Sequence, residues 1–208
     1  GRTDVINRSE DVPLLHTSGR VLAQDLYAAI DLPPFSRSAQ DGYAACSADL
    51  LNASPDSPAV LHVSGQLFAG NTPNQNVAPD VEQALRIMTG APIPPGADCV
   101  VRQEDTDLGL KTVKIFSPFA HNQNICFQGE DVPAGSLLFR QGTRLGWTHI
   151  AALAGQGLTS VKTYQAPKVA ILTTGDELSS PGSELALSHL YDSNGPMLSA
   201  RLSSLHML

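Results

Sequence analysis

Carboxylates, hydroxyls and glycines gather in five short segments, and these are the places where the sequence could do chemistry. The segments read SAQDGYA (38–44), RIMTGAPIPPGADCVVRQE (86–104), GED (129–131), TTGDEL (173–178) and YDSN (191–194). None of them places a serine or cysteine in a recognisable nucleophile motif. Such residue types suit electrostatic positioning of a charged ligand rather than covalent catalysis.

The first two segments predict loops with polar side chains. In SAQDGYA, Asp41-Gly42 is a turn signal, with Gly42 able to adopt a positive φ. In RIMTGAPIPP, a strand runs into a loop that three prolines stiffen. A rigid loop can present Thr89 and nearby backbone N–H groups to an oxyanion. The alternative is that the segment is only a strand with a stiff ending.

The segment TTGDEL follows a continuous apolar run, Val169–Leu172, which predicts a strand buried on both faces of a parallel sheet. Ligands bind at the carboxyl ends of such strands. Residues 173–175 are therefore expected to hold a phosphate or the pterin, and Asp176 or Glu177 a cation or a pterin nitrogen. The alternative is that both acids are merely solvated.

The segment YDSN predicts the start of a helix, since residues 192–194 are all good N-caps and Leu198, Leu202 and Leu205 follow at helical spacing. The free N–H groups of a helix start also bind anions, and Asp192 could bind magnesium. With the preceding strand, this helix would open a doubly wound α/β domain. Because the apolar stripe reaches the last residues without a C-cap, we expect the chain to be truncated.

The segments between these motifs predict mostly short strands. Apolar runs between turn signals give strands at 59–67, with a bulge or turn at Gly65, and at 84–88, 99–103 and 111–116. Residues 71–80 predict a polar surface loop. Residues 148–154 predict a helix with Thr148 as N-cap and Gly155 past its end, and 155–167 a strand and connector.

Composition limits the class of protein. The 208 residues are 42% hydrophobic and 16% charged, enough apolar material for at least one core. The net charge of −7 argues against a nucleic-acid partner. Three separated cysteines and six histidines without metal spacing suggest neither a disulfide framework nor a zinc site. No run approaches a membrane span, so we expect a cytoplasmic protein without a membrane partner.

In order and spacing, the five segments together resemble the MoeA family of molybdopterin molybdenumtransferases, which includes the gephyrin E domain. The resemblance implies an enzyme that inserts molybdenum from molybdate into adenylylated molybdopterin and releases AMP, with Mg²⁺ as the cation. It also implies a homodimer whose active site lies between subunits.

The resemblance further implies a mixed α/β, multi-domain fold. An elongated α+β first domain (1–43 and 132–166) would be split by an inserted β-rich domain (44–131). The beginning of a doubly wound α/β molybdopterin-binding domain (167–208) would follow.

The same resemblance assigns roles to individual residues. The residues implied as catalytic are Asp41, Thr89, Asp131 and Glu177. Those implied to contact the substrate are Thr173, Thr174, Gly175, Asp176, Ser193 and Asn194, and Asp192 is the candidate metal ligand. Asp131 could equally be a surface turn acid.

Two departures from the family pattern favour a different interpretation. Where relatives have R-R-R-G-E-D, this sequence has Cys126-Phe127-Gln128-Gly129-Glu130-Asp131, and where they usually have methionine it has Gln40. Three guanidinium groups that pair with oxyanions are thus missing. The alternative function is a catalytically impaired dimerisation or scaffold module of the same fold.

Overall fold

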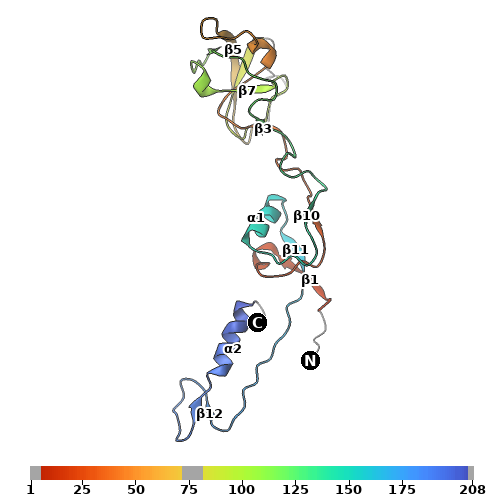
Figure 1. Cartoon of the computed structure of the whole chain (residues 1–208), viewed down its shortest axis with the longest axis vertical. Coiled ribbons are helices and arrows are strands. Elements are labelled where there is room, and N and C mark those ends of the chain that lie inside the picture. Colours follow the sequence, from red (N-terminus) through yellow and green to blue (C-terminus); the bar gives the residue numbers. More distant parts are fainter. Residues whose placement is uncertain (1–5, 72–81, 206–208) are drawn as a thin grey trace. The chain divides into compact units, whose positions relative to one another are not determined.

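The structure, a computed structural model, describes residues 6–71 and 82–205 and divides into two compact units (Figure 1). The inserted unit is Ala28–Ser136, and the flanking unit combines Gly1–Tyr27 with Leu137–Leu208. The mixed α/β class is confirmed, with many short strands and two α-helices in the part of the chain described. The three-domain division expected from the sequence stays a prediction.

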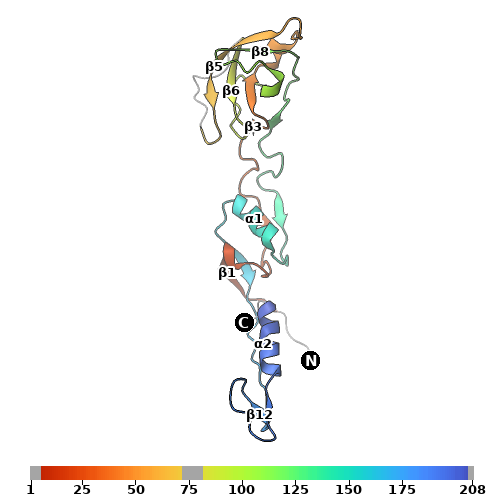
Figure 2. The ribbon, with the colours of Figure 1, turned by 90° about the vertical axis from the view of Figure 1, so that its left-hand side faces the viewer.

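The inserted unit is built on a five-stranded sheet in the order β7-β4-β6-β5-β8. Its strands are β4 (Gly42–Ala45), β5 (Ala59–Leu67), β6 (Gln83–Ile87), β7 (Cys99–Arg102) and β8 (Thr112–Ile115). Figure 2 shows β5, β6 and β8 side by side. Only β5 and β6 pair in parallel; the other neighbours in this sheet are antiparallel.

Both faces of this sheet are covered by apolar side chains, because successive residues of a strand point to opposite faces. On one face Tyr43 and Val101 belong to a buried cluster, and on the other Ala44 and Val100 belong to a second. All four residues of β4 are therefore buried. This central strand begins one residue after Asp41, so a rigid element fixes that carboxylate.

Gly42 is needed for a reason other than the one expected from the sequence. It does not adopt a positive φ. Instead, a Cβ at this position would lie 1.8 Å from the carbonyl oxygen of Val101, on the neighbouring strand β7. Close approach of two backbones, rather than a positive φ, therefore excludes a side chain here.

Two short strands and two 3₁₀ turns complete the inserted unit. They are β3 (Arg37–Ser38), β9 (Ile125–Cys126), η2 (Ser47–Leu50) and η3 (Gln103–Asp105). The segment that precedes β3 and the segment that follows β9 are also hydrogen-bonded to each other. Leu32 N–H donates to Val132 O at 2.8 Å, and Gly129 N–H donates to Pro33 O at 2.9 Å. The two passages of the chain thus run as a hydrogen-bonded pair.

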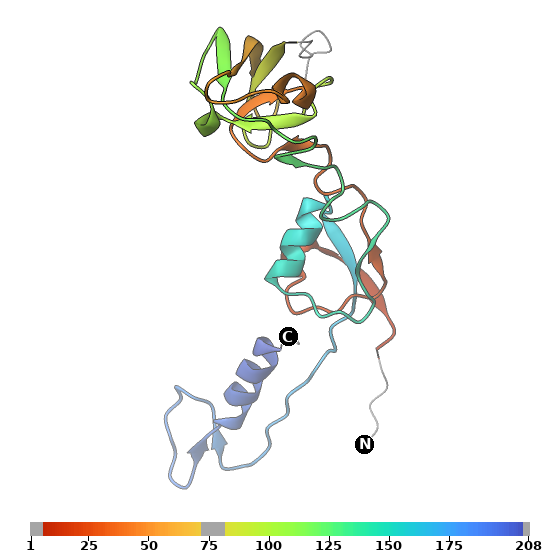
Figure 3. The same cartoon turned by 45° about the horizontal axis from the view of Figure 1, so that its top comes forward.

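The flanking unit has its own apolar core, and Figure 3 shows one helix lying beside its strands. Its elements up to residue 164 are β1 (Ser9–Pro13), η1 (Leu14–His16), β2 (Leu26–Tyr27), β10 (Leu137–Phe139), α1 (Trp147–Gly155) and β11 (Ser160–Tyr164). Strand β1 pairs with β11, and β2 with β10. Leu153 of α1 packs with Leu22, Leu145 and Val161.

Helix α1 begins earlier and ends later than its sequence predicts. Gly146, not Thr148, is the N-cap, and Gly155 is the last helical residue rather than the one after it. The reason lies in His149, whose Nδ1 accepts a hydrogen bond from Gly146 N–H at 3.1 Å. A partner three residues along satisfies this end of the helix without a hydroxyl cap.

Replacing His149 by alanine is expected to cost about 1 kcal/mol of stability in the flanking unit, because the Gly146 N–H loses its acceptor. The ring contact with Phe139, with centroids 4.9 Å apart, would go too. Urea unfolding followed by Trp147 fluorescence measures the effect, since Trp147 is the only tryptophan in the chain. The exposed His16 serves as the matched histidine-to-alanine control, and equal stability of both variants would contradict the prediction.

The segment after β11 forms little regular structure until its second helix. It contains β12 (Leu178–Ser179) and β13 (Leu190–Tyr191), which pair in parallel, and α2 (Asn194–Ser204). No residue from 164 to 205 is buried. The helix with Leu198 and Leu202 is confirmed, with Ser193 as its N-cap.

The strand predicted at Val169–Leu172 does not form. These residues belong to no strand, and Leu172 is 88% exposed. A continuous apolar run becomes a buried strand only when neighbouring strands pair with both of its edges. In the described part of the chain no strand pairs with this run, so it does not become a strand.

The remaining strand predictions are confirmed. Strand β5 has the predicted bounds, and the register between β5 and β6 shifts between Val63 and Gly65, as expected for a bulge. Of the predicted loop at 71–80, all but Asn71 lies outside the described residues. Among residues 6–71 and 82–205, no helix is long and apolar enough to span a membrane.

Candidate active site

Asp41 and Thr89 form the best-defined polar pair among the residues singled out from the sequence. The Oδ1 atom of Asp41 accepts two hydrogen bonds from Thr89, one from its backbone N–H at 2.7 Å and one from Oγ1 at 2.8 Å. Asp41 directly precedes β4, and Thr89 follows β6, its neighbour in the sheet. The two motifs SAQDGYA and RIMTGAPIPP thus meet at one end of the sheet.

Thr89 was expected to face an oxyanion, but its hydrogen bonds go to Asp41 instead. Both of its donors are directed at Asp41, so its oxygen lone pairs rather than its O–H face other groups. The Oδ2 atom of Asp41 accepts no hydrogen bond from the described residues, and the carboxylate is only half-buried. The pair can therefore receive a hydrogen-bond donor or a cation.

The pKa of Asp41 lies below its ordinary value. The largest cause is the backbone N–H of Thr89, followed by the Thr89 hydroxyl; burial opposes both, and the positive charge of Arg86 adds a smaller lowering. Donors directed at a carboxylate stabilise its charged form. Asp41 is thus an anion at neutral pH with one oxygen fixed in place.

Replacing Thr89 by valine should raise the pKa of Asp41 toward its ordinary value, because the hydroxyl is lost while the backbone N–H remains. A carboxylate with a depressed pKa in the folded state stabilises the fold above its unfolded-state pKa. That contribution disappears as the pH falls through the folded-state pKa. An NMR titration of the Asp41 side chain measures the shift. Thr89→Ser, which keeps the hydroxyl, is the control, and an unchanged pKa in Thr89→Val would contradict the assignment.

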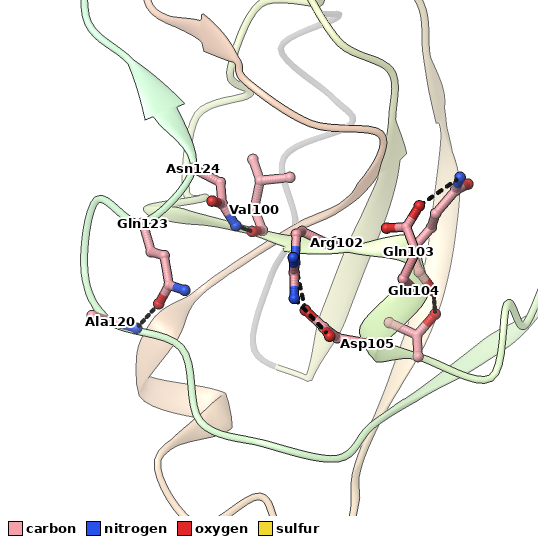
Figure 4. A network of polar contacts seen from close by, with 9 residues as sticks. Val100, Arg102, Gln103, Glu104, Asp105, Ala120, Gln123 and Asn124 are labelled. Atoms are coloured by element: carbon pink, nitrogen blue, oxygen red, sulfur yellow. Dashed lines mark hydrogen bonds and ion pairs between the residues drawn. The ribbon is translucent and has the colours of Figure 1, made fainter.

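The backbone of Asp41 is held from the opposite side by the end of β7. Gln103 N–H donates to the carbonyl oxygen of Asp41 at 3.0 Å. Figure 4 shows this region, in which Arg102 pairs with Asp105, with Nε to Oδ2 at 2.8 Å, and Asn124 Nδ2 donates to Val100 O at 2.8 Å. The position of Asp41 is therefore set by two neighbouring strands.

Asp131 lies on another loop of the inserted unit, and no described contact joins its side chain to Asp41 or Thr89. Its backbone N–H donates to Leu32 O at 3.0 Å, and its side chain is exposed. Nearby, Asp31 accepts hydrogen bonds from Gln128 Nε2 and Ala134 N–H, both at 2.7 Å. The Ala134 bond, then the Gln128 bond, lowers the pKa of Asp31.

A second polar contact lies in the flanking unit, where Asp192 of YDSN meets Thr173 of TTGDEL. Asp192 Oδ2 accepts from the Thr173 hydroxyl at 2.8 Å, and Oδ1 accepts from Gly195 N–H at 3.0 Å. The Gly195 bond, then the Thr173 bond, lowers the pKa of Asp192, with a smaller part from Asn194 N–H. Asp192 thus serves as the acceptor at the start of α2.

Two glycines leave room for carboxylates, Gly175 for that of Glu177 and Gly195 for that of Asp192. A Cβ at Gly175 would lie 2.6 Å from Oε2 of Glu177, and one at Gly195 would lie 2.7 Å from Oδ2 of Asp192. Side chains at these positions would displace the acids. The other predicted contacts, Thr174, Asp176, Ser193 and Asn194, are exposed.

Comparison with known proteins decides the family. Residues 2–157 match the family model described as the MoeA N-terminal region (domain I and II). The chain belongs to the MoeA family. It is 38% identical over 190 residues to a molybdopterin molybdenumtransferase of Staphylococcus epidermidis, covering 91% of this chain and 45% of the relative. It is also 38% identical to one of Haemophilus influenzae, covering 96% of this chain and 48% of that relative.

Solved MoeA structures have the same fold. A molybdopterin biosynthesis MoeA protein from Pyrococcus horikoshii superposes with a TM-score of 0.87 at 36% identity, over 95% of this chain and 52% of that one. The chain spans about half the length of the MoeA relatives it matches.

Whether this MoeA chain could bind a divalent cation depends on how its carboxylates are arranged. No group of three or more His, Cys, Asp or Glu residues within 6–71 and 82–205 is arranged to hold a metal ion. Each oxygen of Asp192 accepts one hydrogen bond from its own chain and keeps a lone pair. Magnesium commonly takes one or two carboxylates together with substrate phosphates, and Asp192 fits that arrangement.

Some residues of this arrangement went unrecognised in the sequence. Arg86 lies in the same motif as Thr89, three residues earlier, and its charge acts on Asp41. Asp31 and Gln128 are 97 residues apart and meet only because the two connecting segments pair. No periodicity or spacing connects such positions.

Proposed function

We propose that the protein carrying this chain inserts molybdenum from molybdate into adenylylated molybdopterin and releases AMP, in the cytoplasm, as part of molybdenum cofactor biosynthesis. The observation that carries the proposal is the Asp41–Thr89 pair, in which two motifs 48 residues apart are joined by two hydrogen bonds. Membership of the MoeA family supports the reaction class.

In this proposal the inserted unit supplies a fixed negative charge. Oδ1 of Asp41 is held by Thr89, so the free Oδ2 atom faces the substrate and accepts from an N–H group of the pterin or binds a cation. Asp131 adds a second carboxylate to the same surface of the substrate.

The flanking unit supplies the phosphate side of the proposed site. Thr173, Thr174 and the backbone around Gly175 contact the phosphate, while Asp176 and Glu177 bind donors on the pterin. Asp192, with Ser193 and Asn194, would hold Mg²⁺, which neutralises phosphate charge when bound. We propose that the active site forms between two subunits of a homodimer.

An assay of AMP release tests the proposal. Adenylylated molybdopterin, molybdate and Mg²⁺ are supplied to the complete product of the gene, and AMP is followed by chromatography. AMP above a no-protein control is expected; none would overturn the proposal.

The 208-residue chain by itself is expected to give no turnover above background. The segment bearing Thr173, Glu177 and Asp192 buries no side chain, so its site residues are not held rigidly. AMP release by this chain at the rate of the complete product would contradict this expectation.

A second candidate is a scaffold module of the same fold with impaired catalysis. The observation that favours it is Cys126-Phe127-Gln128 in place of three arginines. Molybdate-dependent AMP release would overturn it.

A further inference from the structure

Strand β3 lies between the two loops that carry the candidate site of the inserted unit. On one side Ser38 N–H donates to Ala91 O and Gly90 N–H donates to Ser38 O, both at 2.9 Å. On the other side β3 pairs with β9. β3 therefore joins the loop that follows Thr89 to the strand that leads into GED.

The two residues of β3 point to opposite faces, as in any strand. Ser38 is buried and its hydroxyl donates to Gln40 O at 2.5 Å. Arg37 lies on the other face and is partly exposed. Arg37 thus places a guanidinium on the less buried face of β3.

The guanidinium of Arg37 has no partner in the described part of the chain. Its Nε is shielded from solvent yet forms no hydrogen bond there, and no described carboxylate forms an ion pair with it. By contrast, Arg20 pairs with Glu10 and Arg102 with Asp105, each at 2.8 Å. A shielded, unpaired N–H is costly, and a bound anion would relieve the cost.

The strand register gives Arg37 a particular neighbour. Arg37 is directly opposite Cys126 in the antiparallel pair, and residues so placed have adjacent side chains on one face. Cys126 is the first of the three positions at which the family pattern quoted above has arginine. Arg37 therefore places a guanidinium beside a position at which the family pattern has arginine and this chain has Cys126.

The other groups near this position are a thiol and two carboxylates. Burial is the main cause that raises the pKa of Cys126, so its thiol stays neutral; Glu130 and Asp131 raise it further, and Arg37 lowers it. The Glu130 carboxylate accepts from Phe127 N–H at 2.8 Å, and Gln128 is bound to Asp31.

We propose that Arg37 binds a tetrahedral oxyanion, molybdate or a phosphate group, in place of the arginine absent at position 126. The inference rests on the proposed function, since that reaction supplies both oxyanions. A guanidinium fork matches two oxygens of such an anion.

The test measures binding of molybdate alone, and of inorganic phosphate alone, to the complete gene product by equilibrium dialysis. Arg37→Gln should weaken binding of one anion about tenfold to a hundredfold. Arg37→Lys should weaken it less, since it keeps the charge. Arg102→Gln, which removes a surface arginine of the same unit, should leave it unchanged. Far-UV circular dichroism checks folding.

The reciprocal variant makes the test specific. Adding Cys126→Arg to Arg37→Gln should recover binding to within about threefold of the original protein, because the charge returns to the adjacent position. If Arg37→Gln loses affinity for molybdate alone, molybdate is the ligand. If it loses affinity for phosphate alone, the ligand is the phosphate group. Equal binding by Arg37→Gln and the original protein, or no recovery by Cys126→Arg, would overturn the proposal.

AMP release by the same variants separates this inference from the proposed function. If the original protein binds molybdate through Arg37 but releases no AMP, the proposed function fails and the inference stands. If it releases AMP and Arg37→Gln has the same KM for molybdate and the same phosphate binding, the inference alone fails.

Discussion

Replacing Gly42 by alanine is expected to unfold the sheet of the inserted unit locally, with a loss of about 3 kcal/mol or more. The new Cβ would lie 1.8 Å from the carbonyl oxygen and 2.8 Å from the carbonyl carbon of Val101. Both atoms belong to the backbone of a buried strand, so no side chain can move aside. Strands β4 and β7 would have to separate.

Hydrogen exchange measures this effect in each unit separately. Amides of β4 and β6 should exchange roughly a hundredfold faster in Gly42→Ala, whereas those of α1 should not change. Gly155→Ala is the matched control, because nothing lies within 4 Å of a Cβ there. Alanine at that helical position should stabilise slightly. If the β4 amides of Gly42→Ala exchange as slowly as in the original protein, the close approach of Gly42 to the Val101 carbonyl is contradicted.

Replacing Asp41 by asparagine is expected to lower the rate of AMP release about a hundredfold to a thousandfold. The amide keeps the shape of the side chain, and its oxygen can still accept from Thr89 N–H and Oγ1. Only the negative charge is removed. The loss should fall mainly on kcat, because a fixed charge matters most where charge develops in the transition state.

Two further variants control this experiment. Thr89→Ser keeps both donors to Asp41 and should retain activity within about threefold. Thr89→Val loses one donor and should lose about tenfold. If Asp41→Asn has the activity of the original protein, the carboxylate does not take part in the reaction.

Local patterns predicted the strands of the inserted unit well. Apolar runs between turn signals gave the bounds of β5 and the presence of β6, β7 and β8, because the strands that pair with them lie within the same unit. The continuous apolar run at Val169–Leu172 did not give a strand. Burial of that run depends on strands that the described chain does not provide.

Position-specific chemistry was harder to predict. Gly42 was correctly singled out, but the cause, a carbonyl on another strand, cannot be read locally. The prediction of a Thr148 cap failed because the helix begins earlier, at Trp147, with Gly146 as its N-cap and the Gly146 N–H bonded to His149 Nδ1. Asp41 and Thr89 were both chosen, yet their two hydrogen bonds depend on the pairing of β4 with β6. The family resemblance singled out candidate residues, and the pairing of the strands showed which of them are in contact.

The measurement that tests the central claim most directly is the dependence of AMP release on molybdate. The complete gene product is given adenylylated molybdopterin and Mg²⁺, with molybdate varied and sulfate as the control anion. We expect molybdate to accelerate AMP release until it saturates, with sulfate having no such effect and Asp41→Asn nearly abolishing the response. AMP release that is absent, or equally fast without molybdate, would contradict the account.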